Sequence, residues 1–268
     1  MIGEPMDAER QPPAIELVDV VKRFGSTQIL NGVSLTVPPG EITVLLGPSG
    51  AGKTVTINHV VGLLRPNKGK VLVEGRDLAM LTDEDLYAVR RRMAVVLQGT
   101  LPFTCGLFYS LSVYDNVAYA LHERTRMSAE EIQRVALEHL DLVGLRDRAE
   151  LMPDQLSAGM SKRVAIARAL ALDARIVIID DFDSGIDGVR LALLVELLED
   201  VQRRSGATFL VSTHDMSAAR QLADHMAVIH EGRIVVSGDA QSVLESDEPL
   251  VRQLISGGVA GPLQLRNV

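Results

Sequence analysis

The sequence predicts an α/β fold built on a largely parallel sheet, and three observations predict it. Strand-like and helix-like segments alternate along the chain. Two of the strand-like segments, 175–180 and 207–215, are continuous apolar runs, as expected for strands that are covered on both faces. The chain has 268 residues, of which 47% are apolar, so it is long enough to bury a substantial core.

The predicted elements follow one another in this order. Early strands are expected at 15–24, 32–37, 41–47 and 70–75. Helices are expected from Thr54 to about Leu64 and again after Thr82, whose hydroxyl is a typical N-cap. Residues 127–172 have the acidic starts and the Ala/Leu/Arg spacing of helices.

The C-terminal part of the chain predicts a hairpin and an extension. Residues 226–239 read as two strands that turn at Glu231–Gly232. The tail 256–268 contains Gly and Pro but no periodicity, and we predict that a partner orders it.

Composition and charge exclude several classes of function. The net charge of −8 argues against nucleic-acid binding, and the densest basic run, 90–92, is interpreted as a solvated helix face. Cys105 is the only cysteine, which excludes an intramolecular disulfide. We see neither a signal peptide nor an apolar run of about 20 residues, so we expect a cytoplasmic protein.

Residues 47–54 read GPSGAGKT, which fits the phosphate-binding pattern G-x-x-x-x-G-K-[ST] between a strand and a helix. Consecutive N–H groups and the helix N-terminus would cradle phosphates. Lys53 would reach the β- and γ-phosphates, and the Thr54 hydroxyl would coordinate Mg²⁺. The pattern alone leaves the class of nucleoside triphosphatase open. The predicted loop consists of Gly47, Pro48, Ser49, Gly50, Ala51, Gly52, Lys53 and Thr54.

The segment 175–187, RIVIIDDFDSGID, reads as a buried strand that ends in Asp180 and Asp181. Two carboxylates at a strand end suggest a metal ligand beside a proton acceptor. Upstream stand Gln98 and the helix start LSAGM at 156–160, and downstream stands His214 in STHD.

With these elements in this order, residues 14–245 resemble the nucleotide-binding domain of ABC ATPases. The resemblance implies a P-loop NTPase (RecA-like) core with an ABC antiparallel β subdomain and a helical subdomain inserted at about 99–160. Residues 246–268 would then be a C-terminal extension that contacts a partner or the second subunit.

The resemblance also implies a role for each matched residue. Mg²⁺ would be held by Thr54, Gln98 and Asp180. Catalysis would involve Asp181, His214, Gln98 and Lys53. Phe24 would offer an aromatic face to adenine, with a plain core residue as the alternative. Contacts across a dimer would come from Ser157, Gly159 and Asp187.

A single domain of this kind carries half of each composite site, so the resemblance implies a dimer that holds two ATP molecules. A homodimer is expected, with a heterodimer as the alternative. An accessory protein at the tail is a further expected partner.

Within the family, the segments 52–78, 86–98 and 107–121 are most similar to ATPases of MCE and Mla-type lipid transporters, and so are LSAGM and the tail GGVAGPLQL. Amino-acid importers share parts of these segments. The similarity implies lipid transport through a separate permease, with this chain on the inner face of the cell membrane. More than half of the chain's Phe and Tyr residues gather in a cluster that either receives the permease or forms a local core, or does both: Phe103, Phe108, Tyr109, Tyr114 and Tyr119.

Four features depart from the family pattern. Asp181 stands where a catalytic Glu is usual, Phe182 where a Pro is usual, and Ala158 where a signature Gly is usual, and the segment 99–106 is about five residues longer than typical. Asp and Glu differ by only about 0.4 in pKa, but the shorter side chain withdraws the carboxylate by roughly 1.5 Å. Because a misplacement of about 1 Å can lower a rate about a hundredfold, we predict slow ATP hydrolysis.

Three functions therefore compete. The first is the ATPase motor of a lipid transporter. The second is a nucleotide-dependent dimerising switch with little hydrolysis, and the third is a soluble ABC ATPase without a role in transport.

Overall fold

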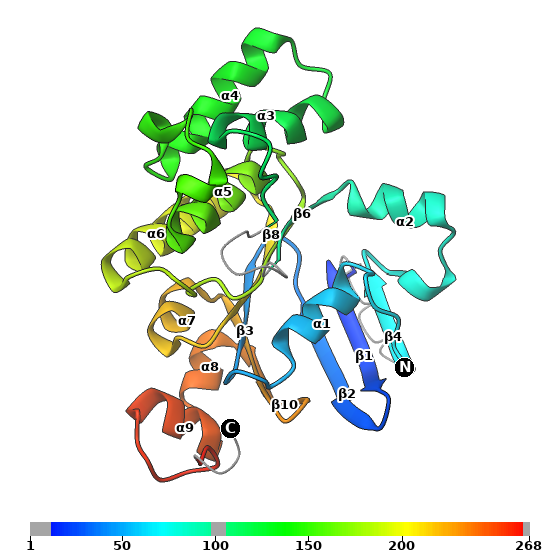
Figure 1. The fold of residues 1–268 in the computed structure, drawn as a ribbon. Helices are drawn as coiled ribbons and strands as arrows, with labels where there is room; N and C mark the ends of the chain where they lie inside the picture. The colour runs from blue at the N-terminus through cyan, green and yellow to red at the C-terminus, as the bar shows by residue number, and fades with distance from the viewer. Residues whose placement is uncertain (1–11, 98–105, 265–268) are drawn as a thin grey trace, which may run out of the picture.

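The computed structural model describes residues 12–97 and 106–264, and its strands form two sheets (Figure 1). One is antiparallel, in the order β2-β1-β4-β5, and the other has the order β10-β9-β3-β8-β7-β6. In the second sheet all neighbours are parallel except β9 with β10, so the predicted fold class is confirmed. The strands are β1 (Ile15–Phe24), β2 (Thr27–Val37), β3 (Ile42–Leu46), β4 (Lys68–Val73), β5 (Arg76–Asp77), β6 (Met93–Val96), β7 (Ile176–Ile179), β8 (Thr208–Thr213), β9 (His225–His230) and β10 (Arg233–Asp239).

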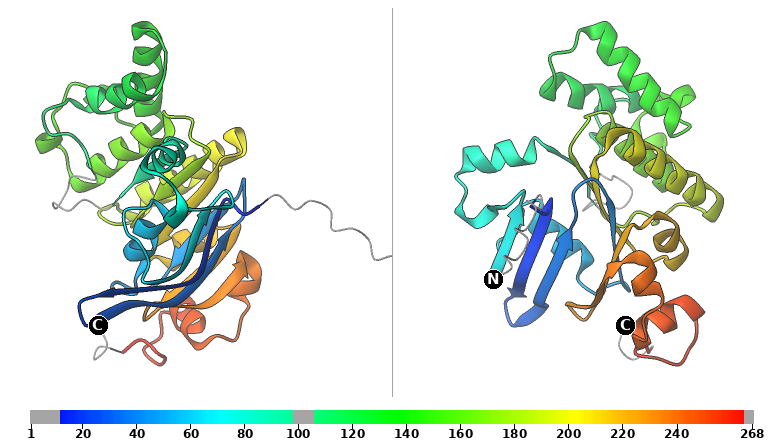
Figure 2. Two further views of the ribbon diagram at one scale, coloured as in Figure 1. Left: turned by 90° about the vertical axis from the view of Figure 1, so that its right-hand side faces the viewer. Right: turned by 180° about the vertical axis from the view of Figure 1, so that it is seen from behind.

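The helices gather in groups around the sheets. Helices α3 and α4 lie at one end of the molecule and α8 and α9 at the other (Figures 1 and 2). Among the described residues, no helix is long and apolar enough to cross a membrane. The helices are α1 (Lys53–Val60), α2 (Asp83–Arg90), α3 (Val113–Arg124), α4 (Ala129–Leu142), α5 (Ala158–Leu170), α6 (Gly188–Ser205), α7 (Met216–Leu222), α8 (Ala240–Leu244) and α9 (Pro249–Ser256).

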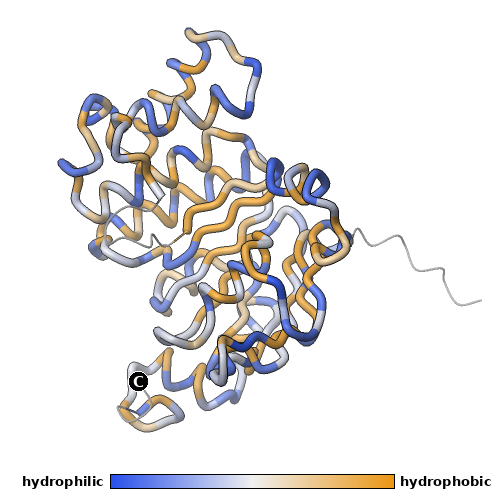
Figure 3. The backbone as a smooth tube through the Cα atoms, turned by 45° about the vertical axis from the view of Figure 1, so that its right-hand side comes forward, coloured by the Kyte–Doolittle hydropathy of each residue, from blue (hydrophilic) through white to orange (hydrophobic). Residues whose placement is uncertain are grey.

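The six-stranded sheet separates two hydrophobic cores. In β3, Leu45 points to the core that includes α1 and the antiparallel sheet. Its neighbours Val44 and Leu46 point to the core beneath α3 to α7, as the two-residue period of a strand requires. Figure 3 shows the apolar strands in the middle of the molecule and the more hydrophilic segments toward its outside.

Several local predictions are confirmed, and several boundaries are corrected. Strand β2 begins at Thr27 rather than at residue 32, β4 spans Lys68–Val73 rather than 70–75, and the region 127–172 is α-helical only in α4 and α5. The Thr82 side chain accepts a hydrogen bond from the Asp85 N–H and caps α2 as predicted. The hairpin turns at Glu231 and Gly232, both with positive φ. Helix α1 ends at Val60 rather than near Leu64, because Gly62 adopts φ 72°, which no right-handed helix accommodates. Gln98, Phe103 and Cys105 lie outside the described residues.

The described part of the tail contacts α9 of its own chain, and the prediction that a partner orders the tail stays a prediction. Gln253 on α9 is 8% exposed, and its amide binds the following chain at three points. Its Nε2 donates to the carbonyls of Gly258 and Leu263, and its Oε1 accepts from the Leu263 N–H. The chain's own Gln253 amide therefore holds residues 257–263, since its donors and acceptor match free backbone groups.

The β9–β10 hairpin supports the predicted phosphate loop. The Gly232 N–H donates to the Ala51 carbonyl at 3.0 Å, and the Gly232 carbonyl accepts from the Asn31 N–H at 2.7 Å. A side chain at Gly47 would lie 2.3 Å from the Ile229 carbonyl, so only glycine fits there. The turn thereby holds the phosphate loop against β2.

Gly232→Ala is expected to destabilise the protein more than Gly25→Ala, the matched control. Both glycines have positive φ, which for alanine costs about 1–2 kcal/mol. A Cβ at Gly25 meets nothing within 4 Å, whereas one at Gly232 would lie 2.0 Å from the Ile29 carbonyl. Urea unfolding of both variants measures the difference, and equal midpoints would contradict the packing argument.

Candidate nucleotide-binding site

Eight of the predicted site residues line one cavity of about 470 Å³ at the carboxyl ends of the parallel strands, whereas His214 and Asp187 are not among its lining residues. The phosphate loop follows β3 and Asp180 follows β7, and these strands flank β8 on either side. Ligands of open α/β sheets bind outside the carboxyl ends of the strands, as here. The cavity is lined by Phe24, Ile29, Ser49, Gly50, Gly52, Lys53, Thr54, Val55, Asp180 and Asp181.

The phosphate loop has the backbone conformation that its glycines predict. Gly50 and Gly52 adopt φ 78° and 108°, and α1 begins directly after Gly52. The N-terminus of α1 and the loop N–H groups can therefore bind an anion. The Lys53 ammonium donates to the carbonyls of Gly47 and Pro48, at 2.7 and 3.0 Å, and so lies along the loop.

The surroundings of Lys53 act on its pKa in two opposite directions. Burial lowers the pKa of Lys53 below its usual value, and the carboxylates of Asp181, Asp180 and Asp183 oppose that shift in this order. Desolvation disfavours the charged ammonium, while nearby negative charges favour it. A polyphosphate in the cavity would add further negative charge beside Lys53 and favour the ammonium more strongly.

Asp180 offers the ligand atom that a divalent cation needs. It is fully buried, and its Oδ1 accepts from the Ser212 hydroxyl at 2.6 Å. Its Oδ2 has no hydrogen-bond partner within the described part of the chain. A buried carboxylate oxygen of this kind is unfavourable unless something binds it, and hard oxygen ligands suit Mg²⁺. Together with the cavity-lining Thr54, Asp180 fits the predicted cation.

Asp181 has a left-handed backbone, with φ 53°. Its N–H donates to the Ser212 hydroxyl at 2.8 Å, and the next N–H, that of Phe182, donates to the Ser212 carbonyl at 2.9 Å. A proline at 182 would lack that N–H and would restrict residue 181 to extended conformations. Phe182 therefore permits the conformation of Asp181, and its ring is fully buried.

His214 lies beside Asp181, held by a residue that the sequence analysis missed. His214 Nδ1 is 2.8 Å from Asp183 Oδ2 and 3.7 Å from Asp181 Oδ1. Asp183 is 6% exposed, whereas the His214 side chain is 52% exposed. Asp183 thus orients the imidazole toward the acidic strand end. The third acidic residue of DDFD was the available signal.

Phe24 lies at the edge of the cavity rather than in the core. Its side chain is 48% exposed, and the Lys22 ammonium is 5.2 Å from the ring centroid. A half-exposed ring that lines the cavity can stack on a planar base. The alternative that Phe24 is a core residue is wrong.

Ser157 and Gly159 do not line this cavity. Ser157 caps α5 and is exposed. A Cβ at Gly159 would lie 2.7 Å from the Gly185 carbonyl, so this turn packs closely on the loop after Asp181. The methyl group of Ala158 also faces Gly185. Ser157 is therefore exposed outside the cavity, whereas Gly159 and the Ala158 methyl contact their own chain.

Asp187 caps α6 and is ion-paired with Arg190 at 2.9 Å. The hydrogen bond from the Arg190 N–H is the main reason why the pKa of Asp187 is lowered. The residue is exposed and follows Gly185, which Gly159 contacts, by two positions.

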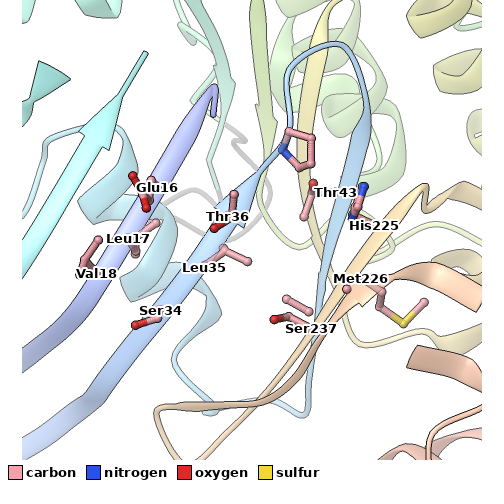
Figure 4. Close-up of a pocket in the computed structure, with 13 residues that line it drawn as sticks. Glu16, Leu17, Val18, Ser34, Leu35, Thr36, Thr43, His225, Met226 and Ser237 are labelled. Atoms are coloured by element: carbon pink, nitrogen blue, oxygen red, sulfur yellow. The ribbon is translucent and has the colours of Figure 1, made fainter. Parts of the chain in front are cut away.

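A second cavity, of about 410 Å³, lies between the two sheets (Figure 4). Its walls come from β1 and β2 on one side and from β3, β9 and β10 on the other, and include Glu16, Thr43 and His225. None of its lining residues belongs to the predicted site. The convergence of predicted residues therefore selects the cavity at the phosphate loop.

Comparison with known proteins agrees with this geometry. The family model for ABC transporters matches residues 30–184. The chain is 40% identical to the probable ribonucleotide transport ATP-binding protein mkl of Mycobacterium leprae, over 93% of this chain and 71% of that protein. It is 36% identical to the intermembrane phospholipid transport system ATP-binding protein MlaF of Escherichia coli K12, over 94% and 92% of the two chains.

A solved structure has the same fold. The dimeric ATP-binding cassette MJ0796, in a post-hydrolysis state bound to ADP and Pi, aligns with a TM-score of 0.76 and 31% identity, over 84% of this chain and 98% of that one. The fold and site define a P-loop ATPase. The chain belongs to the ABC transporter family, as an ATPase subunit.

Ser212→Ala is expected to lower the free energy of unfolding by about 1–3 kcal/mol, because buried Asp180 and the Asp181 N–H each lose a partner. Ser161→Ala is the matched control. Ser161 is 1% exposed, and its hydroxyl has no partner among the described residues, so its removal leaves no group unpaired. Urea unfolding compares the two variants, and equal losses would refute the bridging role of Ser212.

Proposed function

We propose that this chain is the ATP-hydrolysing motor of an MCE/Mla-type lipid transporter that acts through a separate membrane permease. The observation that carries the proposal is the convergence of the phosphate loop, Asp180 and Asp181 on one cavity, with Ser157 exposed outside it. The lipid substrate is supported by the likeness to MlaF over nearly the whole of both chains.

In this proposal each site residue has a distinct task. Lys53 and the loop N–H groups bind the phosphates, and Phe24 stacks on adenine. Thr54, Asp180 and Gln98 would hold Mg²⁺, which neutralises phosphate charge when bound. Asp181 accepts a proton from the attacking water, and His214, oriented by Asp183, contacts the γ-phosphate.

The proposed working unit is a homodimer. Ser157 and Gly159 of one subunit would complete the cavity of the other, with the N-terminus of α5 toward the γ-phosphate. Asp187 would lie at the same interface. The dimeric form of the similar cassette MJ0796 supports this arrangement.

The permease would dock on the aromatic surface formed by Phe108, Tyr109 and Tyr119, which are 44–48% exposed. The rings of Phe108 and Tyr119 meet edge to face at 5.3 Å. Buried Asn116 fixes the loop beneath them, because it bonds the N–H and the carbonyl of Phe108. A preorganised aromatic surface is typical of binding hot spots. Tyr114, which packs against the core, shows that part of the cluster is also structural.

This surface would place the chain on the inner face of the cell membrane. We further propose that residues 14–245 form the ATPase domain, with the helical subdomain at about 99–160. The extension 246–268 would contact the second subunit or an accessory protein. Two apolar side chains within it, Ile255 and Val259, are exposed, which supports such a contact.

A dimerising switch with little hydrolysis is the second candidate, and the aspartate at position 181 favours it. The position of the Asp181 carboxylate distinguishes the hydrolysing motor from the switch, because its reach affects the rate of hydrolysis more than its basicity does. The left-handed backbone of Asp181 offers a route by which the shorter side chain reaches the cavity.

Asp181→Asn is expected to lower ATP turnover at least a hundredfold with unchanged ATP affinity, and to trap the dimer in Mg-ATP. Hydrolysis and sedimentation of both proteins measure this. If wild type and variant are trapped equally and turn over alike, the motor proposal fails and the switch takes its place.

The double variant Phe108→Ala/Tyr119→Ala is expected to reduce co-purification with a polytopic membrane protein at least tenfold. Tyr87→Ala, at an aromatic residue on α2 that is 63% exposed, serves as control and should have no effect. If Phe108 and Tyr119 only bind the permease, the double variant keeps its basal ATP hydrolysis. Loss of that hydrolysis would contradict this role.

A further inference from the structure

Lys162, on the second turn of α5, is a buried cation that the sequence analysis does not use. It is 4% exposed. Its ammonium donates to the carbonyl of Asp181 and, at 3.3 Å, to the carbonyl of Ser184. A buried ammonium must be hydrogen-bonded, and here both bonds go to the loop that carries the proposed base.

These bonds act on a residue whose backbone conformation is unfavourable by itself. Asp181 adopts φ 53°, which costs an L-residue other than glycine about 1–2 kcal/mol unless its surroundings hold it. Ser212 holds its N–H, and Lys162 holds its carbonyl. The direction of the Asp181 side chain therefore depends on both neighbours.

The same helix, α5, begins at residues 156–160, LSAGM, which we call the signature turn. Ser157 caps α5, and Gly159 packs so closely on Gly185 that a Cβ would lie 2.7 Å from the carbonyl. Residues 157–162 thus contact the loop 181–185 twice, once through Gly159 and once through Lys162. A shift of the signature turn must displace this loop or break both contacts.

We propose that Lys162 is a positioning residue that ties the signature helix to the backbone of Asp181. This rests on the proposed function, in which Ser157 contacts the nucleotide of the other subunit and Asp181 acts in its own site. Binding of that nucleotide to Ser157 then sets the position of Asp181 through α5. The two composite sites of the dimer are coupled within each subunit by this lysine.

The test is the single-turnover rate of ATP hydrolysis by the full chain, with ATP affinity measured separately. In Lys162→Met the rate should fall about 10- to 100-fold, because a misplacement of about 1 Å is that damaging, while ATP affinity changes less than threefold. Lys162→Arg keeps the donors and should restore the rate to within about threefold of wild type. Lys70→Met, at an exposed lysine on β4, is the control.

A loss of rate without a loss of affinity is the signature of a group that acts only in the reaction. A wild-type rate in Lys162→Met, or an equal loss of affinity and rate, overturns the proposal. The coupling is tested by combining Lys162→Met with Ser157→Ala. The two effects should be less than additive, and additive effects overturn the link to Ser157.

Failure of the proposed function gives a different pattern. If Asp181→Asn hydrolyses ATP at the wild-type rate, Asp181 is not the base and the function itself is overturned. If Asp181→Asn is inactive and Lys162→Met is fully active, only the positioning role of Lys162 is overturned.

Discussion

The site depends on one hydroxyl group, that of Ser212 at the end of β8. It donates to the buried carboxylate of Asp180 and accepts from the Asp181 N–H, so it joins the ends of β7 and β8. Both carboxylates face the cavity only while these two strand ends keep their spacing. The same residue's carbonyl accepts from the Phe182 N–H. Ser212 thus binds the N–H groups of Asp181 and Phe182, while Lys162 binds the carbonyls of Asp181 and Ser184.

Features that depend on local sequence were predictable. The phosphate loop, the Thr82 cap and the turn at Glu231–Gly232 each follow from a short pattern of residues whose backbone preferences are known. The parallel order of the sheet follows from the alternation of strands and helices. The family relationship also followed from motifs in a fixed order.

The supporting residues were not predictable, because each meets its partner only in the folded chain. Ser212 is 32 residues from Asp180, and Lys162 is 19 residues from Asp181. Gln253 holds a tail without periodicity by bonding its backbone, which no apolar pattern reveals. Asp183 stands in the acidic motif itself, but only its approach to His214 shows what it does.

The buried ring of Phe182 limits how this active site can evolve. A change to proline alone would empty the volume of a fully buried phenylalanine, a loss that costs about 3–5 kcal/mol for truncation to alanine. It would also remove a backbone donor and forbid the conformation of Asp181. If Asp181 is the base that we propose, replacing Asp-Phe by a Glu-Pro pair would therefore require compensating changes in the core around residue 182.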